Sequence, residues 1–257
     1  MFARTTSRLA LEAMAAVLVS ISCAQIAAAD ILVYDQSSEH HFAATAAANI
    51  DPAAVIANAG SFNALLASQS WDAVLIDCPS TQPTGGWQPT IDFIGNGGKV
   101  AMSFWDWDNN SGAGHPGLVS AFGSSGIAET VSLDGRTLVD AGTTAVFNGV
   151  SMPNSDWHDH WADDGDAFGF ALASGTIGMA SLSGIADPIM VLGNGGRTIA
   201  AFIIDEAGNT WLNNGSGVRL WENMYYSLVP EPNSSSLLII AGFALLTRRR
   251  TGNASAN

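Results

Sequence analysis

The densest group of side chains that could do chemistry lies in segment 156–166, which reads DWHDHWADDGD. His158 and His160 alternate, so on an extended strand they would share one face and could bind a transition metal, and Asp163 is a candidate oxygen ligand of the kind that Ca²⁺ accepts. The acidic spacing departs from the calcium-loop pattern, and the two flanking tryptophans could instead stack on a sugar ring. A solvated acidic loop anchored by those tryptophans explains the same residues. We therefore assign no metal ligand and expect no cofactor.

Two other reactive residues are Cys78, at the tip of the predicted strand 73–76, and Ser103, within the predicted strand 100–105. The neighbouring Asp77 opposes formation of a Cys78 thiolate, which favours a buried, unreactive cysteine. Ser103 lies in no Gly-x-Ser-x-Gly frame, although a Ser/His/Asp triad could still assemble from residues distant in sequence. Trp105 and Trp107 alternate beside carboxylates, as in a carbohydrate site, but core packing is the favoured interpretation.

The elements that would position these residues alternate between strand and helix in the first half. Strands are expected at 31–34, 53–57, 73–76 and 100–105, and helices at 42–50, 61–66 and 87–94. Strands separated by helical segments indicate a parallel sheet built from right-handed crossovers. Polar residues follow three of the strands, at 35–40, 77–80 and 106–110. Those are the carboxyl ends, where open α/β sheets place their sites.

The second half is less regular. We expect a short helix at 115–122, strands at 130–139 and 145–150, a β-hairpin of 189–192 and 198–204, and a closing helix at 218–228. Asn194-Gly195 supplies the turn signal of the hairpin. No internal repeat or linker interrupts the segment, so residues 30–229 are expected to form a single α/β domain.

Residues 31–110 resemble the class I glutamine amidotransferase-like superfamily, which has a flavodoxin-like parallel sheet with helices on both faces. The resemblance is carried by ILVYD at 31–35, WDAVLI at 71–76 and FIGNGGKV at 93–100. Enzymes of this superfamily place a nucleophilic cysteine on a tight turn after the Gly-Gly strand. The corresponding segment 102–107 is MSFWDW, which contains no cysteine and no small flanking residues. The resemblance therefore implies the fold without the amidotransferase chemistry.

The charge of residues 30–229 restricts the partners. Four basic residues stand against 21 acidic ones, which gives a formal net charge of −17 with histidine neutral. Nucleic acid and anionic membrane surfaces would repel such a chain, and we exclude both as partners. Cys78 is the single cysteine in this range, so no disulfide can form within it.

The N-terminus has the pattern of a secretory signal peptide. Arg4 and Arg8 form a basic region, an apolar stretch follows, and small residues precede a cleavage point between Ala29 and Asp30. Cys23 raises the alternative of a lipoprotein, but Ser20 stands where a lipobox usually has leucine. We expect a signal peptide of residues 1–29.

The C-terminus combines a Pro-Glu-Pro motif, a short apolar helix at about 234–247 and a basic end. The residues of the motif and the basic end are Val229, Pro230, Glu231, Pro232, Arg248, Arg249 and Arg250. Arginines stay on the cytoplasmic side, which leaves the preceding chain outside. An ordinary short membrane anchor would explain these features, and so would a sorting signal. The tail, residues 230–257, resembles the PEP-CTERM signal of Gram-negative bacteria, and that resemblance implies processing by an exosortase.

Together these features predict an exported protein of the outer cell envelope or extracellular matrix. Before processing it would be anchored in the inner membrane by its C-terminal helix. We expect a non-catalytic protein whose partners are an exosortase-type processing enzyme and extracellular polysaccharide. One alternative is a secreted hydrolase that uses residues at the strand ends or a metal held by segment 156–166. The other is a cation-dependent adhesion module.

Overall fold

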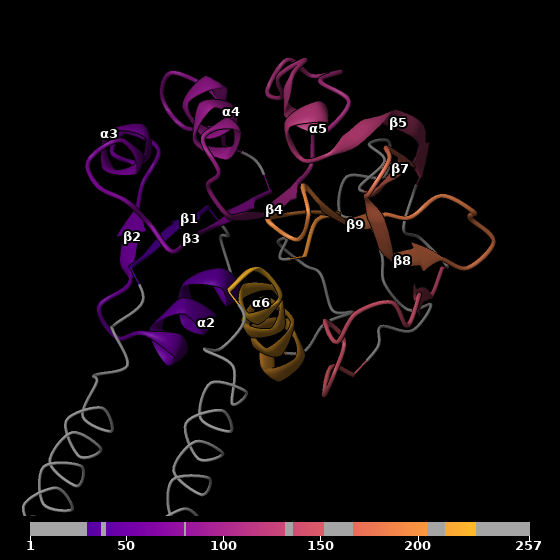
Figure 1. The fold of residues 1–257 in the computed structure, drawn as a ribbon. Coiled ribbons are helices and arrows are strands. Elements are labelled where there is room, and N and C mark those ends of the chain that lie inside the picture. The colour runs from indigo at the N-terminus through magenta and orange to yellow at the C-terminus, as the bar shows by residue number, and fades with distance from the viewer. Residues whose placement is uncertain are drawn as a thin grey trace, which may run out of the picture.

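The computed structural model describes residues 30–36, 40–79, 81–131, 136–151, 167–204 and 214–229. Within these ranges the chain forms an eight-stranded sheet in the order β2-β1-β3-β4-β10-β9-β8-β6 and a two-stranded sheet of β5 and β7 (Figure 1). The strands are β1 (Ile31–Asp35), β2 (Val55–Ala57), β3 (Ala73–Cys78), β4 (Val100–Phe104), β5 (Ser124–Val131), β6 (Leu138–Asp140), β7 (Ala167–Leu172), β8 (Ile177–Leu182), β9 (Met190–Gly193) and β10 (Thr198–Ala201).

Five adjacent strands, β2, β1, β3, β4 and β10, run parallel. Their order is that of a flavodoxin-like sheet, in which the chain changes direction between β1 and β3. Every residue of β1, β3 and β4 is buried, as expected for central strands covered on both faces. The parallel sheet that the first half predicts is therefore confirmed.

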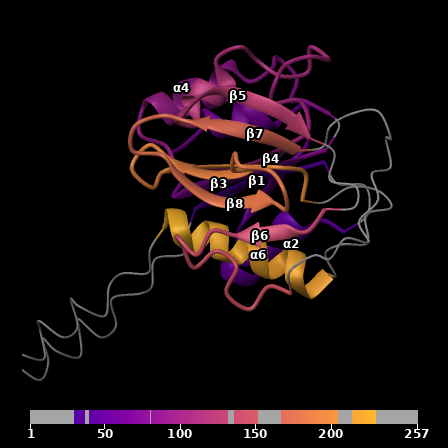
Figure 2. The same cartoon turned by 90° about the vertical axis from the view of Figure 1, so that its right-hand side faces the viewer.

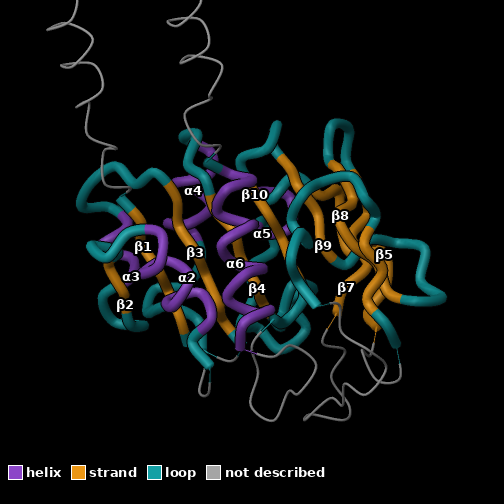
Figure 3. Tube along the Cα trace, turned by 90° about the horizontal axis from the view of Figure 1, so that it is seen from below, coloured by secondary structure: helices purple, strands orange, loops and turns teal. Residues whose placement is uncertain are grey.

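Helices cover both faces of the sheet. One face carries α2 (Phe42–Ile50) and α6 (Asn214–Leu228), and the other carries α3 (Phe62–Leu66), α4 (Gln88–Gly95) and α5 (Leu118–Ala121) (Figure 1). Figure 3, seen from the first of these sides, shows α2 and α6 lying across the parallel strands. In Figure 2, β5 and β7 lie on the opposite side of the sheet from α6. Among the described residues, no helix is both long and apolar enough to cross a membrane.

Helices α2 and α6 pack closely because α6 has a glycine at the point where it faces α2. A Cβ built on Gly217 would lie 2.4 Å from ring atoms of Phe42, whose side chain is 2% exposed. The Gly217→Ala substitution should therefore lower the free energy of unfolding by about 1–2 kcal/mol, although alanine is the better helix former. Gly95→Ala at the end of α4 is the matched control, because no atom of the described residues lies within 4 Å of its added Cβ. Chemical denaturation of both variants decides the matter, and equal or higher stability of Gly217→Ala would contradict the close packing.

The second half confirms some predicted elements and corrects others. Asn194 and Gly195 have φ angles of 51° and 66° in the turn that joins β9 to β10, so the predicted hairpin is confirmed. Its second strand ends at Ala201, however, and not at residue 204 as predicted. The strand predicted at 145–150 is wrong, because those residues form turns. Its apolar signal comes from Val146 and Phe147, which are buried against the α2/α6 side of the core.

Three predicted boundaries were also wrong. The strand expected at 130–139 is divided between β5 in the small sheet and β6 at the edge of the large one. The helix expected at 115–122 is reduced to α5. The strand expected at 53–57 begins at Val55, because Ala53 lies in a turn in which its N–H donates to Asp51 Oδ1 over 2.9 Å.

Candidate functional site

Three polar side chains lie in a row at the carboxyl ends of β1, β3 and β4. Asp35 is paired in register with Asp77, and Asp77 with Ser103. Alternation along each strand places all three on the face covered by α2 and α6. This is the edge at which the sequence predicted a site, and all three residues are at most 7% exposed.

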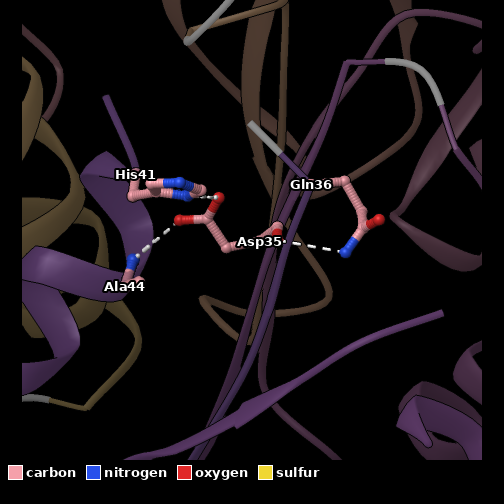
Figure 4. A network of polar contacts seen from close by, with 4 residues as sticks. All are labelled: Asp35, Gln36, His41 and Ala44. Atoms are coloured by element: carbon pink, nitrogen blue, oxygen red, sulfur yellow. Dashed lines mark hydrogen bonds and ion pairs between the residues drawn. The ribbon is translucent and has the colours of Figure 1, made fainter. Parts of the chain in front are cut away.

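Asp35 connects the end of β1 to the start of α2. Its Oδ2 accepts a hydrogen bond of 3.0 Å from the backbone N–H of Ala44, in the first turn of the helix, and its Oδ1 lies 3.0 Å from Nδ1 of His41 (Figure 4). His41 offers no side-chain cap to α2, so the carboxylate of Asp35 satisfies a helical N–H that would otherwise lack a partner. The side chain of Gln36 turns back and donates to the carbonyl of Asp35.

His41 holds an uncommon backbone conformation at this point. Its φ and ψ are 51° and 47°, a left-handed conformation that few residues other than glycine adopt. The side chain is 56% exposed, whereas that of Asp35 is 1% exposed. The pair therefore consists of a solvent-facing imidazole that is oriented by a buried carboxylate.

Ser103 is part of the core rather than an exposed nucleophile. Its side chain is 0% exposed, and its Oγ accepts a hydrogen bond of 2.9 Å from the backbone N–H of Ile204. Among the described residues no histidine is hydrogen-bonded to this oxygen. Residues 103–108 contain no left-handed backbone conformation of the kind that a strained nucleophile turn requires. The triad that the sequence left open does not assemble at Ser103 from the described residues.

Replacing Ser103 with alanine tests this structural role. The substitution leaves the buried N–H of Ile204 without its acceptor, so the free energy of unfolding should fall by about 1–3 kcal/mol. Ser120→Ala is the control, because the Ser120 hydroxyl lies on the surface, where water replaces its bond to the Gly117 carbonyl. Urea unfolding curves that place the two variants within error of each other would contradict the role given to Ser103.

Cys78 is buried on the opposite face of the sheet, beside α3 and α4, as the sequence predicted. Its Sγ lies 3.0 Å from the carbonyl oxygen of Thr81, to which the Tyr34 hydroxyl also donates over 2.5 Å. Both groups therefore hold the chain that follows β3. Burial first, and then the charge that Cys78 would carry as a thiolate, raise the pKa of the Tyr34 phenol well above its ordinary value.

Because the pKa of Tyr34 is raised, the free energy of unfolding should fall as the pH rises through the alkaline range. Below about pH 10 the phenol is protonated in both the folded and unfolded chains, and its contribution is fully present. Above that pH the unfolded chain loses the proton and the folded chain keeps it, so stability falls as pH rises toward the folded pKa. Tyr34→Phe should remove up to about 1.4 kcal/mol per pH unit from this slope. Urea unfolding between about pH 9 and 11 measures it, and an unchanged slope would contradict the assignment.

The loop after β4 is organised by Asp106 and Trp107. Asp106 is 2% exposed and accepts hydrogen bonds from the backbone N–H groups of Ser111 and Gly114. Trp107 is 1% exposed, and its indole N–H donates to the carbonyl of Ala201 over 2.9 Å. The core interpretation of Trp107 is confirmed, so Trp105 and Trp107 do not form an exposed pair for a sugar ring.

The remaining sequence-based candidates lie outside the described residues. These are the segment 156–166 with His158, His160 and Asp163, the cleavage point before Asp30, and the sorting tail from Pro230 onward. Within the described ranges, no group of three or more His, Cys, Asp and Glu side chains is arranged to hold a metal ion.

The Asp35–His41 pair is the feature that sequence reasoning missed. The sequence predicts that the polar segment after β1 lies at a carboxyl end of the sheet, but it does not pair Asp35 with His41. A usable signal was present, because an aspartate ends a buried strand six residues before a histidine that directly precedes a helix. A carboxylate in that position can reach the first turn of the helix.

Comparison with known proteins gives information about the fold and not about the family. No protein-family model matches the sequence, and no curated protein sequence is significantly similar to it. Among solved structures, a Thermoplasma acidophilum protein assigned to the GMP synthases is similar with a TM-score of 0.50 and 10% identity, over 78% of this chain and 94% of that one. A cytoplasmic protein of Salmonella typhimurium LT2 has a TM-score of 0.48 and 11% identity, over 77% of this chain and 99% of that one. The chain thus has the glutamine amidotransferase-like α/β fold that the sequence predicted, and at this identity the similarity extends to the fold alone.

Proposed function

We propose that this chain is an exported protein of the outer cell envelope or extracellular matrix. In this proposal the α/β fold serves as a binding scaffold for extracellular polysaccharide and performs no covalent catalysis at its strand ends. Export rests on the two terminal signals in the sequence, and the absence of covalent catalysis rests on the burial of the described strand ends. Each part has its own test.

The burial of Ser103 is the observation that carries the second part. The end of β4 is where the superfamily places its nucleophile, and Ser103 is the hydroxyl residue in that region. Its Oγ is 0% exposed and already accepts the N–H of Ile204. The residue that follows, Phe104, is also 0% exposed, so neither of the last two residues of β4 faces solvent. The parallel sheet is present, but the residue at the nucleophile position is part of the core. We therefore infer that the fold serves for binding.

The acidity of residues 30–229 narrows the choice of ligand. With four basic residues against 21 acidic ones, the surface repels anionic polymers and carries few groups that bind phosphate or sulfate. A neutral polysaccharide meets no such repulsion, because its hydroxyl groups bind through uncharged hydrogen bonds. Neutral glycans are therefore the preferred class.

The export part is tested by changing the sorting motif. The full-length chain is expressed in a Gram-negative host that contains an exosortase, and the products are separated into inner-membrane, outer-envelope and medium fractions. The wild type should lose its C-terminal tail and leave the inner membrane. A variant with Pro230→Ala and Glu231→Ala should remain there with its tail attached. A variant with Ser234→Ala and Ser235→Ala is the matched control and should be processed normally. Processing that is equal in all three would contradict sorting by this motif.

A further inference from the structure

His41 and His115 make hydrogen bonds that hold their neutral rings in opposite tautomers. Nδ1 of His41 faces the carboxylate of Asp35 at 3.0 Å, and because a carboxylate accepts, Nδ1 must carry the proton. Nδ1 of His115 instead accepts the backbone N–H of Gly117 at 3.0 Å, so the proton of its neutral ring is on Nε2. When the ring is neutral, His41 therefore presents a lone pair on Nε2, and His115 presents an N–H.

The Nε2 atom of His41 is not the nitrogen that contacts Asp35. The side chain is 56% exposed, and no described residue is hydrogen-bonded to Nε2. The ring cannot turn without cost, because Asp35 is held at the same time by the N–H of Ala44 (Figure 4). The left-handed backbone of His41 adds a second constraint on the position of the ring.

We propose that His41 is the polar anchor of a ligand site at the carboxyl end of β1, and that Nε2 accepts a hydrogen bond from a hydroxyl group of a neutral saccharide. Asp35 is a positioning residue that fixes the tautomer and direction of the imidazole. This inference rests on the proposed function and names a residue and a contact for it. The site requires a donor on the ligand, because Nε2 offers an acceptor. The neighbouring carboxylate of Asp35 disfavours an anionic ligand.

Substitution of Asp35 with asparagine should reverse the tautomer of His41 while the fold persists. The side-chain oxygen of asparagine can still accept the N–H of Ala44 and cap α2. Its NH₂ group would then face Nδ1 and make that nitrogen the acceptor, which moves the ring proton to Nε2. The variant would present a donor where the wild type presents an acceptor.

The experiment combines nitrogen NMR of histidine-labelled full-length protein with saccharide titrations. At about pH 8, where an ordinary imidazole is neutral, the wild type should show His41 protonated on Nδ1 and His115 protonated on Nε2. His41→Ala and His115→Ala assign the two signals. The Asp35→Asn variant should show His41 protonated on Nε2, with its unfolding midpoint close to that of the wild type. A wild-type His41 protonated on Nε2 would overturn the proposal.

Titration with maltopentaose, cellopentaose and chitopentaose tests the ligand. At least one should bind the wild type and shift the His41 signal, and both His41→Ala and Asp35→Asn should weaken that binding about tenfold, as expected for one hydrogen bond. His115→Ala should leave it unchanged. Saccharide binding that survives His41→Ala at full strength would overturn the anchor and leave the proposed function standing. If none of the three binds the wild type, both the anchor and the polysaccharide function are contradicted.

Discussion

Replacing Trp107 with alanine should lower the free energy of unfolding by about 3–5 kcal/mol. The indole is 1% exposed and lies at edge-to-face distances of 5.7, 5.1 and 5.4 Å from the rings of Phe104, Phe122 and Phe170. Its N–H also donates to the carbonyl of Ala201 at the end of β10. The substitution removes a large apolar volume from the joint between the two sheets and leaves a buried carbonyl without its donor.

Trp105→Ala is the matched control for that prediction. Trp105 is half-buried, and its indole N–H makes no hydrogen bond to the described residues, so truncation removes less packing and no polar contact among them. Chemical denaturation should show a loss for Trp105→Ala well below that for Trp107→Ala. Trp107→Phe should fall between them, because it keeps most of the ring packing and loses the bond to Ala201. Equal losses for the two alanine variants would contradict the central place given to Trp107.

The second large effect is expected at Gly193, the last residue of β9. A Cβ built there would lie 2.0 Å from the backbone carbonyl oxygen of Phe122 and 3.0 Å from Oγ1 of Thr198. The same carbonyl accepts the hydroxyl of Thr198 over 2.9 Å, so the added methyl group would push apart a buried hydrogen bond. Because backbone atoms cannot move aside as a flexible side chain can, Gly193→Ala should cost about 3 kcal/mol or more.

Gly126→Ala in β5 provides the comparison for Gly193. No atom of the described ranges lies within 4 Å of a Cβ built on Gly126, and its φ is not in the left-handed region. The midpoint of thermal unfolding should fall steeply for Gly193→Ala and change little for Gly126→Ala. A Gly193→Ala protein as stable as the wild type would show that β9 and the end of α5 are less closely packed than described.

The first half of the fold could be predicted because local and tertiary preferences agree there. The strands β1, β3 and β4 are continuous apolar runs, which is the pattern of parallel strands covered by helices on both faces. The helices between them are marked by alanine-rich or proline-led segments. Each sequence signal therefore points to the same arrangement as the packing of the sheet.

The errors in the second half arise where apolar residues serve packing outside regular structure. Val146 and Phe147 look like strand residues, but they anchor a turn against the core. The run from Thr130 to Val139 crosses from one sheet to another, and periodicity cannot reveal such a change of partner. Strand pairing over long sequence separations is a tertiary property, so local pattern alone does not determine it.

The location of the candidate site could be predicted from the sequence, but the hydrogen-bond partners of its residues could not. Polar residues after each strand marked the carboxyl edge, and Asp35, Asp77 and Ser103 do align there. The role of each residue depended on partners that the sequence does not show. Ser103 is committed to the distant N–H of Ile204, and Asp35 to His41 and Ala44.

The most direct test of the central claim, that the strand ends carry no covalent chemistry, is residue-level mass spectrometry of the folded full-length protein after treatment with a fluorophosphonate and iodoacetamide. Buried groups with committed hydrogen bonds should not react, so we predict no adduct on Ser103 and none on Cys78. Iodoacetamide should modify Cys78 once the protein is unfolded in urea, which shows that the reagent is competent. An adduct on either residue in the folded protein would contradict the account and establish an accessible nucleophile at the carboxyl end of the sheet.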